Sequence, residues 1–77
     1  MFGYDERLLA LRRKGIILHW SDIVRLLAAR GIKVHASHLY NMKNGILRTP
    51  KANLVLAACD EIISEFEKSA AERKNVV

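Results

Sequence analysis

The fold of this chain is decided by residues 35–45, which read HASHLYNMKNG. Leu39 and Met42 lie three positions apart, so a helix places both apolar side chains on one side. The other residues of the stretch are mostly polar, and the Asn before Gly45 is a common end of a helix. We therefore expect a short helix here that buries one face and presents a polar face to solvent.

The polar face of this helix, expected over residues 35–44, contains no acidic residue that would repel a phosphate. Asparagine can pair with both hydrogen-bonding atoms on the major-groove edge of adenine, and hydroxyl groups can serve bases or phosphates. We expect Asn41 and Ser37 to be the foremost contacts. The base contacts predicted from this face are Ser37, His38, Tyr40, Asn41 and Asn44.

Towards the N-terminus, glycines divide the chain into helical lengths. We expect a first helix over residues 4–14, closed by Gly15, and a second helix from the N-cap Ser21 to Gly31. The apolar residues 16–20 are interpreted as a buried connector, because they are few and have no second strand to pair with. Two helices and one connector are thus expected before the decisive stretch.

Towards the C-terminus, Thr49 and Pro50 mark the start of a long helix. Threonine can cap a helix, and proline is preferred at the first helical position because its missing N–H is not needed there. Ile46, before this start, continues the apolar side of the preceding short helix. We expect the last helix to span residues 50–73. Residues 1–77 then form one all-α domain with four or five helices.

Charge is unevenly distributed along the chain. Residues 1–51 carry ten Lys and Arg against three acidic residues, whereas residues 52–77 carry three basic and five acidic residues. A basic surface on a small domain is typical of a polyanion partner, and nucleic acid is the commonest one. An anionic membrane surface is the competing interpretation.

The stretch LYNMKNG, residues 39–45, is followed by RTP at 48–50 and by an apolar helix that contains LVLAA at 54–58. This order resembles the Cro and lambda-repressor-like helix-turn-helix family over residues 21–63. In that family the recognition helix ends at a glycine, a basic loop leads to a proline, and another helix packs behind. The resemblance implies a helix-turn-helix over residues 21–45, whose second helix enters the major groove of DNA.

Two features differ from the family. The chain contains no glutamine, a residue that usually opens one or both helices of the motif. Gly31 also lies two residues farther from Gly45 than the family's turn glycine lies from its closing glycine. Either the turn is longer by two residues, or Lys33 occupies the usual glycine position and Gly31 ends the second helix early.

Cationic and capping residues flank the expected reading helix. Long basic side chains can grip the DNA backbone, and the first turn of a helix can offer its amides to a phosphate. Two interpretations have equal support for Arg12, Arg13 and Lys14. Either they contact phosphates, or they only offset the partial negative charge at the end of the first helix. The predicted phosphate contacts are Ser21, Lys33, His35, Lys43, Arg48, Thr49 and Lys51.

The last helix carries more apolar surface than a domain of this size needs to cover. Ile62, Ile63 and Phe66 are therefore predicted to form a homodimer contact. The alternative is a monomer in which this helix folds back on Phe2 and Tyr4.

These features predict a sequence-specific regulator of transcription that binds double-stranded DNA, a repressor that occupies a near-palindromic operator as a homodimer. An activator or an excision-type architectural factor would have the same features. The alternative is a protein-interaction module, such as a phage inhibitor or an antitoxin-like partner. A single cysteine and the lack of a long apolar run suit a cytoplasmic protein without membrane contact.

Other chemistry has little support in the sequence. No constellation of titratable residues points to an enzyme, so we expect no small-molecule substrate and no cofactor. No metal is expected, because His35 and His38 have only Cys59 as a third ligand. Trp20 is interpreted as a core anchor. The acidic residues of the last helix are interpreted as a solvated face: Asp60, Glu61, Glu65 and Glu67.

Overall fold

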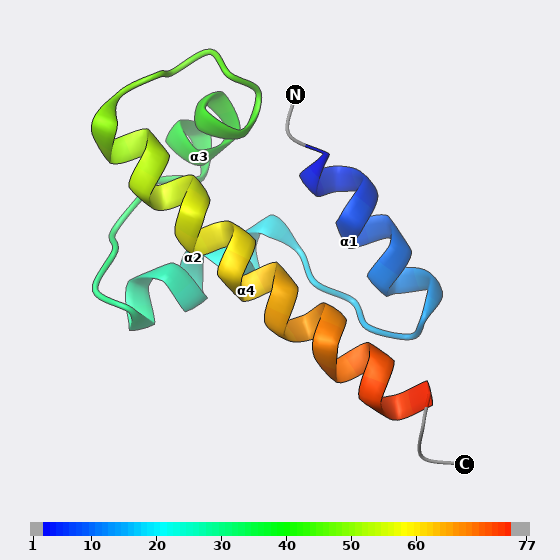
Figure 1. The fold of residues 1–77 in the computed structure, drawn as a ribbon. Helices are drawn as coiled ribbons and strands as arrows, with labels where there is room; N and C mark the ends of the chain where they lie inside the picture. The colour runs from blue at the N-terminus through cyan, green and yellow to red at the C-terminus, as the bar shows by residue number, and fades with distance from the viewer. Residues whose placement is uncertain (1–2, 75–77) are drawn as a thin grey trace.

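The computed structural model describes residues 3–74, and Figure 1 shows four helices joined by short connectors. No strand occurs in this part of the chain. The prediction of an all-α fold with four helices is confirmed, and none of these helices is long and apolar enough to cross a membrane. The helices are α1 (Tyr4–Arg13), α2 (Trp20–Ala29), α3 (Ala36–Lys43) and α4 (Pro50–Lys74).

The long helix α4 is the spine of the molecule, because α1, α2 and α3 each pack against it. In Figure 1, α3 lies beside the first turns of α4, whereas α1 runs alongside its middle and second half. The side chains that α4 buries are Ala52, Val55, Leu56, Ala58, Cys59, Ile62, Ile63 and Ala70. The other helices add to the same core Leu11, Ile23, Leu27, Leu39 and Met42.

Ile62 and Ile63 belong to this core, with 2% and 0% of their surface exposed. Because α1 and α2 pack against α4, these side chains are covered within a single copy and do not offer the dimer surface predicted for them. Phe66, the third residue of that prediction, is half-buried. The helix folds back on Tyr4, whose hydroxyl lies 3.4 Å from a backbone carbonyl of α4 and donates to it. Phe2 lies outside the described residues.

The first three helices end in the same backbone arrangement, a glycine followed by an isoleucine. At the end of α2, Gly31 has a φ of 83°, its N–H donates to the carbonyl three residues earlier, and the N–H of Ile32 donates to the carbonyl of Leu27. This is a Schellman motif, which needs the left-handed backbone that glycine adopts at least cost. The same pair of hydrogen bonds closes α1 at Gly15 and α3 at Gly45. All three helix ends expected from the glycines are confirmed.

The start of α2 differs from the prediction, because its N-cap is His19 rather than Ser21. The backbone N–H of His19 donates to the carboxylate of Asp22 at 2.9 Å, as the acidic residue of a capping box does. The helix therefore starts at Trp20, and Ser21 is an exposed residue of its first turn.

The connector between α1 and α2 is buried on one side only. Ile16 and Leu18 are 9% and 8% exposed and pack into the core, as the apolar run predicts. Ile17 between them is 62% exposed, so its side chain lies at the surface. The connector therefore contributes both to the core and to the apolar surface.

The connector between α2 and α3 covers residues 30–35, which is longer than the three or four residues usual in a helix-turn-helix. Gly31 ends α2, and no residue other than glycine has a positive φ in the described chain, so Lys33 does not adopt the backbone of a turn glycine. Ile32 and Val34 are half-buried against the core. The additional residues of this connector therefore pack against the core and do not form a protruding loop.

The left-handed backbone at Gly31 is open to a direct test. Gly31→Ala is expected to lower the free energy of unfolding by about 1–2 kcal/mol, the cost of a left-handed L-residue. A Cβ there meets no atom within 4 Å, so backbone strain is the whole effect. Gly31→Asn should cost less, because asparagine tolerates this conformation. Urea unfolding measures both, and equal stability of Gly31→Ala and wild type would contradict the motif.

Candidate nucleic-acid interface

The short helix α3 is held by its inner face. Leu39 and Met42 are 1% and 4% exposed, as their spacing predicts, and α3 packs against both α2 and α4. Ile46 does not continue this apolar side, since it is 70% exposed. The left-handed Gly45 redirects the chain after α3, and Leu47 packs against the core in place of Ile46. The orientation of α3 is thus fixed from two directions.

The outer face of α3 is polar and contains no acidic side chain. Ser37, His38 and Tyr40 are exposed, and 57% of the surface of Tyr40 is accessible. Asn41 and Asn44 are half-buried, and the backbone carbonyl of Asn41 accepts the hydrogen bond that closes the helix. The five predicted base-contacting residues therefore lie on or directly after one short helix, three of them at the surface.

The first turn of α3 brings two histidines together. His35 is the N-cap residue, and its ring lies edge-to-face on the ring of His38 with 5.6 Å between the centroids. Both side chains are exposed. In the described part of the chain, no three His, Cys, Asp or Glu side chains gather closely enough to hold a metal ion. The histidines are placed instead as surface donors or acceptors.

Lys43, in the last turn of α3, is engaged within the chain. Its ammonium pairs with the carboxylate of Asp5 at 3.0 Å and lies 5.1 Å and 5.0 Å from the ring centres of Trp20 and Tyr40. Only 10% of the Lys43 side chain is exposed. This residue, predicted to contact a phosphate, therefore ties the end of α3 to α1 and α2. We call Asp5, Trp20, Tyr40 and Lys43 the Lys43 cluster.

The carboxylate of Asp5 organises the Lys43 cluster. It also accepts a hydrogen bond from the indole N–H of Trp20 at 2.9 Å. The hydrogen bond from Trp20, followed by that from Lys43, lowers the pKa of Asp5 below its ordinary value of 3.8. Sequence reasoning missed this cluster because its members come from three different helices.

Three other cations surround α3 and remain at the surface. Lys33 precedes α3, Arg48 follows it, and Lys51 lies in the first turn of α4. The guanidinium Nε of Arg48 donates to the carbonyl of Gly45 at 3.0 Å, which holds this side chain against the end of α3. Among residues 3–72, none of the three cations forms an ion pair with an acidic side chain. Their charge is therefore available to a partner.

Two further predicted contacts lie at helix starts. The Thr49 side chain accepts the backbone N–H of Ala52 at 3.0 Å, so it caps α4 as expected. Ser21 follows Trp20, which lines a small cavity together with Ala36 and Tyr40 of α3. The first turn of α2 therefore lies beside α3.

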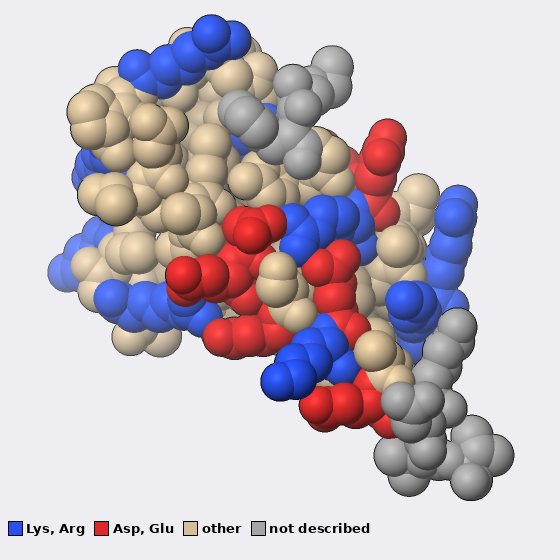
Figure 2. All heavy atoms as spheres, in the orientation of Figure 1, with Lys and Arg blue, Asp and Glu red and all other residues tan. Residues whose placement is uncertain are grey.

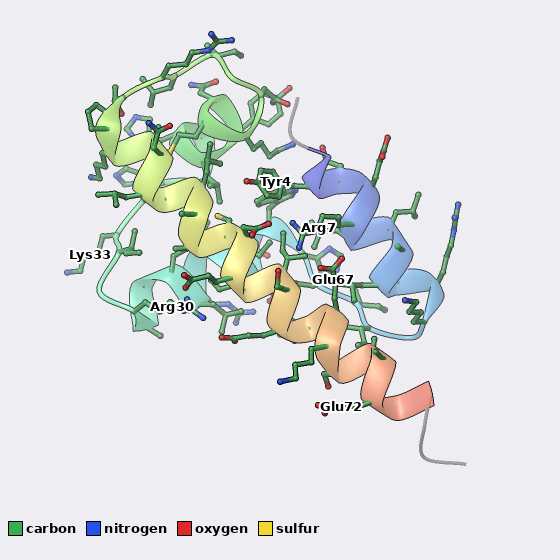
Figure 3. The ribbon with its side chains drawn as sticks, in the orientation of Figure 1. Tyr4, Arg7, Arg30, Lys33, Glu67 and Glu72 are labelled. Atoms are coloured by element: carbon green, nitrogen blue, oxygen red, sulfur yellow. The ribbon has the colours of Figure 1, made fainter. Side chains whose placement is uncertain are left out.

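Four acidic residues of α4 lie on an exposed face, as expected, and each of them is also paired with an arginine of the N-terminal half. These ion pairs are Arg7 with Asp60 and Glu67, and Arg30 with Glu61 and Glu65. Figure 3 shows Arg7 and Glu67 between α1 and α4, whereas Lys33 projects at the left edge of the view, away from α1. The acids therefore fasten α1 and the end of α2 to α4.

Charge is unevenly distributed over the surface. Figure 2 shows acidic atoms over the middle of α4 with basic atoms beside them, whereas the region around the connector from α3 to α4 shows basic atoms and no acidic ones on this face. The excess positive charge of residues 1–51 is therefore exposed partly around α3, where Lys33, Arg48 and Lys51 lie.

Comparisons of the chain with protein-family models, with curated proteins and with solved structures find no match. The resemblance to the Cro and lambda-repressor-like family stays a prediction from residues 21–63. An interpretation of function therefore depends on the geometry and charge of α3 and its surroundings.

The Lys43 cluster predicts unequal effects for two lysines. Lys43→Met should lower the free energy of unfolding by about 1 kcal/mol, because it removes an ion pair and two cation–π contacts. Lys33→Met is the matched control, and its effect should stay within about 0.5 kcal/mol, since Lys33 is exposed. Urea unfolding of the two variants measures the difference. Equal losses would show that the cluster does not hold α3.

The lowered pKa of Asp5 predicts a pH-dependent contribution to stability. Its ionised carboxylate stabilises the fold above about pH 4, and this contribution is lost as the pH falls through the lower pKa of the folded state. Asp5→Asn should be less stable than wild type by under about 1 kcal/mol at neutral pH, because the carboxylate is 69% exposed.

Urea unfolding of wild type and Asp5→Asn at several pH values measures this contribution. The two proteins should converge at low pH, once Asp5 is protonated in both the folded and the unfolded chain. Glu6→Gln, a change at an exposed neighbouring acid, serves as the control. A stability difference that does not change with pH would contradict the role of the carboxylate.

Proposed function

We propose that this chain is a transcriptional repressor that binds double-stranded DNA in a sequence-specific manner and occupies a near-palindromic operator as a homodimer. In this proposal α3 enters the major groove, its outer face reads bases, and cations around it contact phosphates. The protein acts in the cytoplasm, needs no cofactor and is not an enzyme.

One observation carries the proposal: α3 has a buried apolar side and an exposed, acid-free polar side, with cations at both of its ends. Leu39 and Met42 anchor the helix, and Lys33 and Arg48 flank it without acidic partners among the described residues. A rigid helix reads bases better than a loop, because its side chains keep a fixed register.

The side chains divide into two roles under this proposal. Base contacts come from Ser37, His38 and Tyr40 at the surface, with Asn41 and Asn44 at the half-buried edge. Phosphate contacts come from Lys33, Arg48 and Lys51, with Ser21, His35 and Thr49 near helix starts. Lys43 supports this arrangement from within, since its ammonium holds the end of α3.

Selection of binding sites from random duplex DNA tests the proposal. We expect enrichment of a short, near-palindromic sequence. The affinity for it should fall steeply with salt, and the slope of the logarithm of the binding constant against the logarithm of the salt concentration should be about −0.9 for each phosphate contacted. If no sequence is enriched and the affinity does not depend on salt, the proposal fails. A protein-interaction module is then the remaining interpretation.

Lysine variants locate the interface. The double variant Lys33→Ala/Lys51→Ala should weaken binding to all sequences and reduce the logarithmic salt slope by about 2, because two phosphate contacts are lost. Lys68→Ala removes an exposed lysine from the second half of α4 and should leave the slope unchanged. Equal effects of the two variants would place the DNA elsewhere on the molecule.

A further inference from the structure

A groove lies between the connector from α2 to α3 and the first turns of α4. We call it the Leu54 groove, and the residues that line it are Gly31, Ile32, Lys33, Lys51, Leu54 and Val55. Its floor is apolar, because Val55 belongs to the core and Ile32 packs against it. The groove has a volume of about 400 Å³, and the charged residues that line it are two lysines.

The lysine side chains leave the groove open. Long lysine stems often lie over apolar surface and shield it from water. Leu54 nevertheless remains 71% exposed, and Lys33 and Lys51 are exposed as well. Figure 3 shows Lys33 on the connector, pointing away from the ribbon. The apolar floor is therefore accessible from solution.

The two cations of the groove have no acidic partner within the described chain. Lys33 and Lys51 form no ion pair among residues 3–72. The acids farther along α4, Glu61 and Glu65, are both bound by Arg30, at 2.9 Å and 3.0 Å. A negative group that pairs with these lysines must therefore come from a partner.

Other exposed apolar side chains lie beside charges that are already paired. The groove formed by the α1–α2 connector, α2 and α4 contains Asp22 and Arg25, which pair with each other. Tyr40 lies beside Lys43, whose ammonium is held by Asp5. The Leu54 groove, by contrast, combines an apolar floor with two cations that have no acidic partner among residues 3–72.

The size of the Leu54 groove suits a small molecule. Ligand pockets have volumes of about 300–1,000 Å³ and combine apolar walls with a few polar groups. A protein interface of standard size uses about 20–30 residues on each side, whereas six of the described residues line this groove. A second copy of the chain placed here across a two-fold axis would bring lysine against lysine.

We propose that the Leu54 groove binds a small carboxylic acid with an aliphatic chain, such as a medium-chain fatty acid. The chain lies on the apolar floor beside Leu54, and the carboxylate pairs with Lys33 and Lys51 at the rim. Burial of the CH₂ groups supplies most of the affinity. The ion pairs select a carboxylate over an amine.

This ligand would also compete with DNA. That consequence rests on the proposed function, in which Lys33 and Lys51 contact phosphates. A carboxylate bound to these lysines occupies the cations that a phosphate needs, so the ligand lowers the affinity for the operator. The acid then acts as an inducer that releases the repressor.

Titration of the full chain with octanoate, below its micelle concentration, tests the groove without DNA. Amide resonances followed by nuclear magnetic resonance should shift in a saturable way at residues 31–33 and 51–55, with a dissociation constant of about 1 mM or lower. Octylammonium has the same chain and the opposite charge, and acetate has the charge without the chain. Each should bind at least about 10-fold more weakly than octanoate.

Matched variants separate the contact with the chain from the contact with the charge. Leu54→Asp should raise the dissociation constant for octanoate at least about 10-fold, since it removes an apolar contact and adds a like charge. Ile46→Asp, at another exposed apolar residue, should leave it unchanged. Lys33→Gln/Lys51→Gln should raise it at least about 5-fold, whereas Lys68→Gln should not.

Circular dichroism melting checks that each variant is folded, and the double lysine variant gives the same test if Leu54→Asp unfolds. Three results would overturn the proposal. They are the lack of saturable shifts at residues 31–33 and 51–55, equal binding of octylammonium and octanoate, and octanoate binding as tight as that of wild type in folded Leu54→Asp or Lys33→Gln/Lys51→Gln.

Competition with a selected duplex separates this inference from the proposed function. Saturating octanoate should raise the dissociation constant of wild type for the duplex at least about 10-fold, because two phosphate contacts are lost, whereas acetate at the same concentration should not. Unchanged duplex binding while octanoate occupies the groove would overturn the competition. A chain that binds octanoate and no DNA would refute the proposed function alone.

Discussion

The apolar stripe of α4 is the surface on which α1, α2 and α3 all pack, and the arrangement of every other element depends on its burial. Ala52 and Val55 near its start are each 1% exposed, and Ile62 and Ile63 farther along are buried as well. A single helix thus places three others whose connectors are short. The face of α3 that points away from the core is exposed to solvent, and this face is the candidate interface.

Ion pairs decide which of the basic residues remain available. Arg7 and Arg30 are bound to the acids of α4, and Lys43 is bound to Asp5 and two aromatic rings. A net charge of +5 says nothing about this division. The paired cations hold helices together. Lys33, Arg48 and Lys51 form no ion pair within residues 3–72, and they give the region around α3 its positive character.

Local signals in the sequence predict the helices well. Gly31 and the other glycines before isoleucine mark three helix ends, and Thr49 before Pro50 marks the start of α4, because these signals act through hydrogen bonds within a few residues. The inner face of α3 follows from the spacing of Leu39 and Met42 for the same reason.

Features that depend on distant contacts could not be predicted in this way. The apolar spacing shows that Ile62 and Ile63 must be covered, but it does not show that α1 and α2 cover them within one copy. Lys43 looks like any exposed lysine in the sequence, because its partners Asp5 and Trp20 lie on other helices. The exposure of Ile17 likewise depends on how the connector crosses the core.

The amide resonances of the chain, followed by nuclear magnetic resonance during titration with a selected DNA duplex, test the role of α3 most directly. If α3 reads DNA, the largest shift changes fall on residues 33–51, and those of the second half of α4 change little. Changes concentrated on the acidic middle of α4, or none at saturating duplex, would contradict an interface built on α3.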